Sequence, residues 1–244
     1  MARRGGLTIA SLALAALAAC ADNDSVYPTA SGDTVTAVFQ DGAQPDESYG
    51  GTRDAFLKDG PTNDFRNRCY GNVPFDTVGA ASLAGSPYER RIVVKMDLSS
   101  ITDCASVLFS SLSIAFESAP PESITLEMHR IVRPSSSATW LEGMDGIQSG
   151  VSWLTADGEE SWAAPGGDYE SVPLHRARIA GDTVVAFPVP PALARDWILA
   201  PATNHGVLLR SAEFPSGRSV LAHLRETFNP AARPRLSVTY LRGG

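Results

Sequence analysis

Hydrophobic and polar positions alternate with a period of two over most of this chain. In the segment Arg91–Leu98, every second residue from Ile92 onward is apolar, whereas Lys95 and Asp97 face the other way. A period of two places successive side chains on opposite faces of a strand. The pattern therefore predicts a half-buried β-strand whose apolar face lies against a core.

The same alternation predicts strands along the rest of the chain. Ser106–Glu117 and Ile124–Val132 are the next two candidates. Later strands are predicted at Val172–Ile179, Thr183–Val189, Gly206–Arg210, Val220–Arg225 and Leu236–Tyr240. One helix is predicted to begin at Pro191, because proline suits a first helical turn. Leu193 and Trp197 follow it at a spacing of i, i+4, which places them on a common face.

Many short strands without alternating helices are typical of antiparallel sheet proteins. The 17 prolines and 21 glycines suit the many turns that such a fold needs. No repeat of about 20–50 residues occurs, which argues against a propeller or a solenoid. The sequence therefore predicts an all-β fold, an antiparallel β-sandwich of jelly-roll type with one short helix before a late strand. We assign it to a single domain over residues 35–241.

The first twenty residues differ in composition from the rest of the chain. Arg3 and Arg4 form a short basic region, and the apolar segment Leu7–Ala19 carries no charge. This length suits a signal peptide and is too short for a transmembrane helix. The last residues, LAAC ending at Cys20, resemble the lipobox of bacterial lipoproteins. The alternative is an ordinary secretory signal with an incidental cysteine.

The lipobox resemblance implies cleavage before Cys20, with acyl chains on its sulfur and on the new amino terminus. Residues 1–19 are then the signal peptide, and residues 20–34 form a polar lipidated tether. Two or three acyl chains give stable membrane anchoring. We expect a lipid-anchored protein of the bacterial cell envelope. Ala21, in place of Asp, favours the outer membrane or the cell surface over the inner membrane.

Export also bears on the two remaining cysteines, because disulfides persist in oxidising compartments. Cys69 and Cys104 form an even pair, and we expect a disulfide between them. Two separated buried thiols are the alternative. The net charge is −7, and apart from the lysines Lys58 and Lys95 the basic residues are scattered arginines. Without a basic cluster to neutralise phosphates, we expect no nucleic-acid partner.

Several segments, taken in order, resemble the DNRLRE domain, a secreted bacterial and archaeal β-sandwich related to the carbohydrate-binding modules. Arg91–Ile101 is similar to the family's R-x-L-x-x-F-D-L-S-S-I strand, with Met96 where Phe is usual. The resemblance continues through the TWLEG segment at Thr139, through Asn204–Leu209 and through the closing strand Arg233–Tyr240. It spans residues 34–241 and implies a β-sandwich with non-catalytic binding of polysaccharide.

Catalytic motifs are absent from the sequence. The four histidines lack metal-binding spacing, and no G-x-S-x-G, Walker or G-x-G-x-x-G pattern occurs. Glu142, flanked by Trp140 and Gly143, is the best single catalytic suspect, but we favour a carboxylate that only anchors its loop. We therefore expect a protein that is not an enzyme and has no catalytic cofactor.

The segment Pro134–Ser171 is longer than an ordinary connection and is rich in aromatic residues. Flat rings beside polar side chains suit the apolar faces and hydroxyl edges of sugars. The candidate ligand-binding residues are Trp162, Asp168, Tyr169, Trp140, Glu142 and Trp153. The alternative is that the tryptophans cap one end of the core. We expect Trp140 and Trp153 to be buried and Trp162 to be exposed.

Two functions from different classes remain. One is a lipid-anchored module that binds polysaccharide at the cell surface. The other is a structural or assembly lipoprotein that engages an envelope protein partner or the cell wall. Asp145, Asp157 and Asp168 could add a calcium ion (Ca²⁺) through carboxylates and loop carbonyls, although no D-x-D-x-D-G loop occurs.

Overall fold

The computed structural model describes residues 33–83, 85–117, 123–133, 139–181 and 183–243. The signal peptide, Cys20 and nearly all of the expected tether lie outside these residues. The part of the chain from Gly32 onward forms one compact unit. Within the described ranges, no helix is long and apolar enough to cross a membrane.

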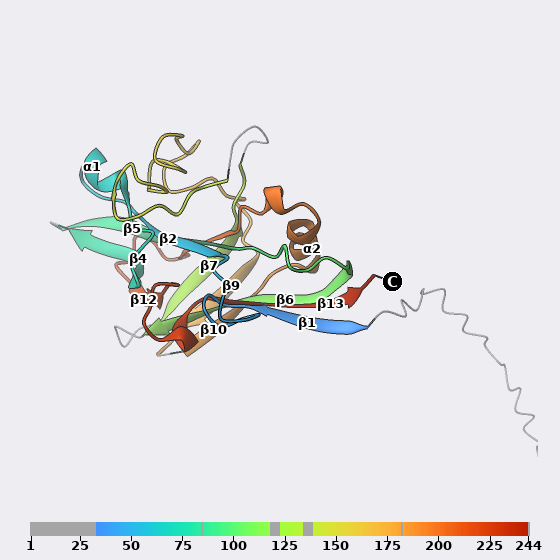
Figure 1. The fold of residues 1–244 in the computed structure, drawn as a ribbon. Coiled ribbons are helices and arrows are strands. Elements are labelled where there is room, and N and C mark those ends of the chain that lie inside the picture. Colours follow the sequence, from blue (N-terminus) through green and yellow to red (C-terminus); the bar gives the residue numbers. More distant parts are fainter. Residues whose placement is uncertain (1–32, 84, 118–122, 134–138, 182, 244) are drawn as a thin grey trace, which may run out of the picture. The chain divides into compact units, whose positions relative to one another are not determined.

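The fold is all-β, as the alternating pattern predicts, and its strands pair antiparallel (Figure 1). The strands are β1 (Thr34–Phe39), β2 (Thr52–Lys58), β3 (Arg68–Cys69), β4 (Phe75–Leu83), β5 (Ser86–Met96), β6 (Cys104–Glu117), β7 (Ile124–Arg130), β8 (Gly146–Ile147), β9 (His175–Ile179), β10 (Thr183–Pro188), β11 (Val207–Ser211), β12 (Ser219–His223) and β13 (Arg235–Arg242). The helices are α1 (Asn63–Arg66) and α2 (Pro191–Leu199), with 3₁₀ turns η1 (Pro201–Thr203) and η2 (Pro230–Ala232).

One large sheet folds back on itself to make the sandwich. Its strand order is β1-β13-β6-β12-β4-β5-β11-β7-β9, with β10 added to β6 and β2 added to β5. Apolar side chains of β1, β6, β10 and β13 meet those of β2, β5, β7 and β11 in one core cluster. Strands β3 and β8 form a separate small sheet. The antiparallel β-sandwich class is therefore confirmed.

The inner faces of the strands and the helix follow the sequence pattern. On β5, Ile92, Val94 and Met96 face the core, as the alternation predicts. Helix α2 begins at Pro191 and precedes the late strand β11, and its buried side chains include Leu193. The period-two and i, i+4 patterns are confirmed because each depends only on the local geometry of its own segment.

The outer face of β5 differs from the prediction, because most of it is buried as well. Val93 is 0% exposed and Arg91 is 7% exposed. Residues 139–169, which we call the tryptophan layer, cover this face and lie outside β2 and β5 (yellow in Figure 1). A second apolar cluster joins this layer to the sheet; it contains Ala55, Leu57, Val93, Ile131, Trp140, Val151, Trp153, Ala156, Trp162 and Leu208. Strand β5, which the sequence predicts to be half-buried, is therefore buried on both faces where the tryptophan layer covers it.

The expectation of an exposed Trp162 is wrong. Trp140 is 0% exposed, and Trp153 and Trp162 are each 5% exposed. The indole N–H of Trp140 donates to the carbonyl of His205 at 2.8 Å. That of Trp162 donates to the carbonyl of Ser152 at 2.9 Å. All three rings are core caps, because the apolar outer face of the sheet needs a cover.

The expected disulfide is also wrong, since Cys69 and Cys104 are free thiols in this structure. The Cys69 thiol lies in the small β3–β8 sheet and donates to the carbonyl of Glu142 at 2.8 Å. Cys104 instead begins β6, where it pairs with Arg242 of β13. The two cysteines therefore belong to different layers, which the even count of cysteines could not reveal.

Candidate functional site

Asp168 and Tyr169, two of the expected ligand-binding residues, hold the tryptophan layer in place. The Asp168 carboxylate accepts the backbone N–H of Ala164 at 3.1 Å. The Tyr169 hydroxyl accepts a hydrogen bond from Arg210 at 2.7 Å, and its ring packs edge-on against His129. Both residues also line a pocket of about 580 Å³. Tyr169 is the only member of the expected aromatic platform that is partly exposed in the described chain.

The three aspartates considered for calcium do not come together. Asp145 forms a bidentate ion pair with Arg68, at 2.9 and 3.0 Å. Asp157 accepts the backbone N–H groups of Glu159 and Glu160, at 2.9 and 2.7 Å. The acidic group that does come together among the described residues is a different one, so the calcium site considered for Asp145, Asp157 and Asp168 is not formed.

A cleft of about 550 Å³, which we call the polar cleft, lies between the start of β2, the end of β5 and η1. Its lining residues are Ser48, Tyr49, Gly50, Gly51, Arg53, Lys95, Met96, Asp97, Leu98, Thr139, Pro201 and Asn204. The Tyr49 hydroxyl donates to the carbonyl of Asp97 at 3.0 Å. The side-chain amide of Asn204 donates to the carbonyl of Met96 at 2.8 Å. These bonds fix the cleft walls to the sheet.

Two cations stand directly opposite each other in this cleft. Arg53 of β2 pairs in register with Lys95 of β5, and both side chains line the cleft. Like charges at directly opposed positions of an antiparallel pair repel each other. The sheet therefore carries an electrostatic cost at this point, which a bound anion would relieve.

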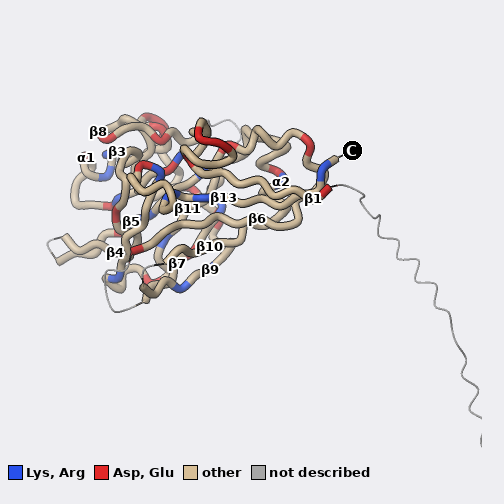
Figure 2. Tube along the Cα trace, turned by 60° about the horizontal axis from the view of Figure 1, so that its bottom comes forward, with Lys and Arg blue, Asp and Glu red and all other residues tan. Residues whose placement is uncertain are grey.

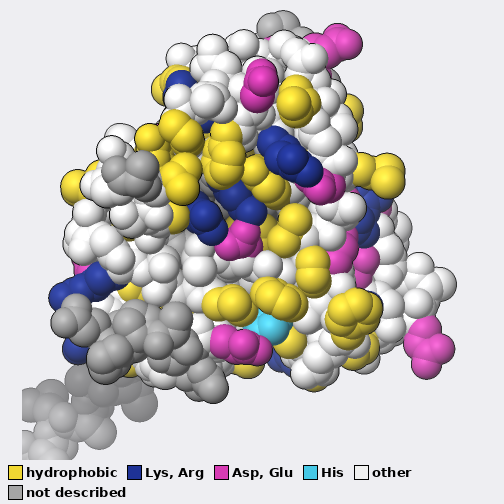
Figure 3. Space-filling model, turned by 90° about the vertical axis from the view of Figure 1, so that its left-hand side faces the viewer, with side chains coloured by type: hydrophobic (Ala, Val, Ile, Leu, Met, Phe, Trp, Pro, Cys, Tyr) yellow, Lys and Arg dark blue, Asp and Glu magenta, His cyan; other side chains and the backbone are white. Residues whose placement is uncertain are grey.

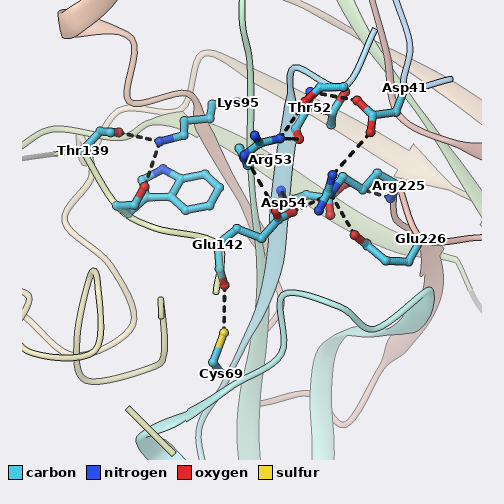
Figure 4. A network of polar contacts seen from close by, with 12 residues as sticks. Asp41, Thr52, Arg53, Asp54, Cys69, Lys95, Thr139, Glu142, Arg225 and Glu226 are labelled. Atoms are coloured by element: carbon cyan, nitrogen blue, oxygen red, sulfur yellow. Dashed lines mark hydrogen bonds and ion pairs between the residues drawn. The ribbon is translucent and has the colours of Figure 1, made fainter. Parts of the chain in front are cut away.

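Lys95 is held by neutral groups. Its ammonium donates to the hydroxyl of Thr139 and to the carbonyl of Trp140, each at 2.8 Å, and lies 4.5 Å from the Trp140 ring centroid (Figure 4). Burial and the nearby Arg53 lower the pKa of Lys95 to about 8. Among the described residues, no carboxylate forms an ion pair with Lys95, although the negative charge of Glu142 acts on it from a greater distance.

Arg53 is also incompletely neutralised. Its guanidinium donates to the carbonyls of Gly50 and Thr52, at 2.8 and 2.7 Å, and lies 3.9 Å from the Glu142 carboxylate. The side chain is 43% exposed, so it remains accessible from the cleft. Arg53 and Lys95 therefore present positive charge to the same open space.

In a second pocket, of about 510 Å³, the basic side chains are paired with carboxylates. It lies on the face that carries α1 and the β4–β5 hairpin, where apolar side chains surround charged ones (Figure 3). Its Lys58 forms an ion pair with Asp76, and its Arg68 forms one with Asp145. Because each cation there has an acidic partner, the second pocket has less need of an anion than the polar cleft.

Buried carboxylates lie on the other side of Arg53 (Figure 4). Glu142 accepts the backbone N–H of Asp54 at 2.9 Å and the guanidinium of Arg225 at 2.7 Å. Glu142 thus anchors the tryptophan layer to β2, which is the role that we favoured from the sequence. Burial raises the pKa of the Glu142 carboxyl and that of the Glu226 carboxyl, the latter to about 7.

Arg53, Asp54 and Arg225 were missed by the sequence analysis. Lys95 was placed correctly on the second face of its strand, but nothing marked it as a site residue. The register between β2 and β5 brings Arg53 and Lys95 together. No local motif encodes that register, so the only available signal was a lone lysine on a strand otherwise rich in arginine and aliphatic residues.

By its fold the chain is an antiparallel β-sandwich protein with an added tryptophan layer. Neither a protein-family model nor any curated protein matches the chain. The resemblance to the DNRLRE domain therefore stays a prediction. Acidic and basic positions are interspersed along the described chain (Figure 2), so the cation pair of the polar cleft is a local feature.

Proposed function

We propose that this protein is a lipid-anchored β-sandwich module of the bacterial cell envelope that binds polysaccharide without catalysis. The polar cleft is the binding site. The observation that carries this proposal is the pair Arg53 and Lys95, directly opposed in a cleft of about 550 Å³. A carboxylate or sulfate group on a sugar would neutralise both cations, so the expected ligand is an acidic polysaccharide.

The rest of the cleft suits a sugar ring. Sugars present apolar C–H faces edged with hydroxyl groups, and binding sites combine apolar contacts with a few polar groups. Tyr49 and Pro201 supply apolar surface. Thr139 and Asn204 supply hydroxyl and amide groups for hydrogen bonds. This mixture, with charge at one point, favours a hydroxylated anion over a simple inorganic one.

Affinity electrophoresis in gels containing polyuronate, sulfated or neutral polysaccharides tests the site. We expect the acidic polymers to retard the protein and the variants Arg53→Gln and Lys95→Met to weaken retention about tenfold or more, since each charge-assisted contact contributes about 1.5–3 kcal/mol. Arg242→Gln is the matched control, because Arg242 is half exposed, pairs with Asp103 and does not line the cleft. Retention that is equal in wild type and both cleft variants would refute the site.

The membrane anchor is supported by the lipobox resemblance at Cys20. Labelling with a fatty-acid analogue tests it directly. We expect label on the wild-type protein and none on Cys20→Ser, because the cysteine sulfur is the attachment point. Label that persists in Cys20→Ser would contradict the anchor without affecting the cleft.

A structural or assembly role in the envelope is the second candidate. The burial of Trp140, Trp153 and Trp162 supports it, because these rings cannot serve as a flat platform for sugars. If no polysaccharide retards the wild-type protein, this role becomes the better explanation. Cross-linking in intact cells, followed by identification of the linked protein, would then give the partner.

A further inference from the structure

Three carboxylates converge beside the polar cleft from separate parts of the chain. Asp54 lies on β2, Glu142 in the tryptophan layer and Glu226 after β12 (Figure 4). One oxygen of each residue lies within 4.8 Å of an oxygen of the other two. Carboxylates that repel one another do not gather in a partly buried place without compensation.

The spacing of these oxygens fits one calcium ion. Calcium binds oxygen at about 2.3–2.6 Å, so two oxygens on the same ion lie at most about 4.6–5.2 Å apart. Magnesium binds at about 2.0–2.1 Å and would need the oxygens within about 4.2 Å. Oxygens that all lie within 4.8 Å of one another can share one calcium ion, whereas magnesium also demands a stricter octahedral geometry.

Oxygens without partners point to the same conclusion. The Asp54 side chain is 0% exposed, and one of its oxygens accepts the backbone N–H of Arg225 at 3.0 Å. Its other oxygen, Oδ1, has no hydrogen-bond partner in the described chain, and neither does Oε2 of Glu226. Buried polar atoms are nearly always satisfied. These two oxygens are available as ligands.

The charges around the cluster are also unbalanced. Asp41, Asp54, Glu142 and Glu226 face the guanidinium groups of Arg225 and Arg53. Arg225 is the guanidinium group in close contact with this cluster, and it faces several carboxylates at once, so a bound cation would relieve their repulsion.

We propose that Asp54, Glu142 and Glu226 form a calcium-binding site. The Glu226 side chain is 20% exposed, which gives the ion a route from solvent. The ion would link β2 to the tryptophan layer through Glu142 and to the segment after β12 through Glu226. Calcium binding would therefore stabilise the folded protein, whether or not the polar cleft binds polysaccharide.

Isothermal titration calorimetry with calcium chloride tests the site on the full mature protein in detergent, after treatment with a chelator. We expect one calcium ion per chain, a higher Tm in calcium than in chelator, and at least tenfold weaker binding of magnesium. Asp54→Asn and Glu226→Gln should each weaken calcium binding at least tenfold. Asp64→Asn, an exposed carboxylate of α1, is the control and should bind as the wild type does.

Two results would overturn the proposal. The first is a wild-type protein that shows neither heat nor a Tm shift with millimolar calcium, while Asp54→Asn raises the Tm in chelator; the cluster would then be neutralised by protons. The second is unchanged calcium affinity in Glu226→Gln. This variant removes a proposed ligand on the solvent side of the site, so it can be tested even if Asp54→Asn does not fold. Neither result bears on polysaccharide retention, which is measured separately.

Discussion

Replacing Trp162 with alanine is the sharpest test of the tryptophan layer. The ring is 5% exposed, its N–H donates to the carbonyl of Ser152, and the Arg133 guanidinium lies 5.0 Å from its centroid. The substitution removes both contacts and leaves a cavity between the layer and the sheet.

The expected loss follows from these contacts. Truncating a buried tryptophan to alanine costs about 3–5 kcal/mol, and the loss of the Ser152 hydrogen bond contributes about 1 kcal/mol within that range. Trp162→Phe keeps most of the ring and loses the N–H, so about 1–2 kcal/mol is expected. For a chain of this size, a loss of about 4 kcal/mol lowers the Tm by about 8–16 °C.

Urea denaturation followed by far-UV circular dichroism measures these losses. Phe228→Ala is the control, because Phe228 is 92% exposed and should change stability by less than about 0.5 kcal/mol. A loss for Trp162→Ala no larger than that of the control would refute the assignment of this ring to the core.

Three further outcomes are expected. Binding of an acidic polysaccharide should weaken as pH rises through about 8, because the Lys95 amine is charged below its pKa and neutral above it; Kd measured from pH 6.5 to 9.5 tests this, and a flat profile in the wild type contradicts it. In the folded protein a thiol reagent should modify the partly exposed Cys104 before the buried Cys69, and it should modify both after denaturation without a reductant. If no free thiol is found at these two positions, the two cysteines are joined in a disulfide after all. Arg91→Met removes a buried partner of Glu89, at 2.6 Å, and should cost about 3 kcal/mol in urea denaturation; a loss below about 1 kcal/mol would show that the pair is dispensable.

The sequence by itself determined the strand character of the chain and the inner face of its clearest strands. The alternation that starts at Ile92 depends only on strand geometry, so β5 and its core face could be read directly. The start of α2 at Pro191 was likewise predictable, because proline and the following i, i+4 pair act within a single helix. These features need no knowledge of the neighbouring strands.

Only the tertiary structure decided what covers the outer faces and which charges meet. Val93 and Trp162 are distant in sequence, and the apolar contact between their segments decides that the ring is a core cap. Arg53 and Lys95 meet through strand register, and Asp54 meets Glu226 because the segment after β12 lies against β2. Long-range pairing sets these neighbours, and a single sequence carries no local signal for it, because side-chain spacing specifies each strand and not its partner.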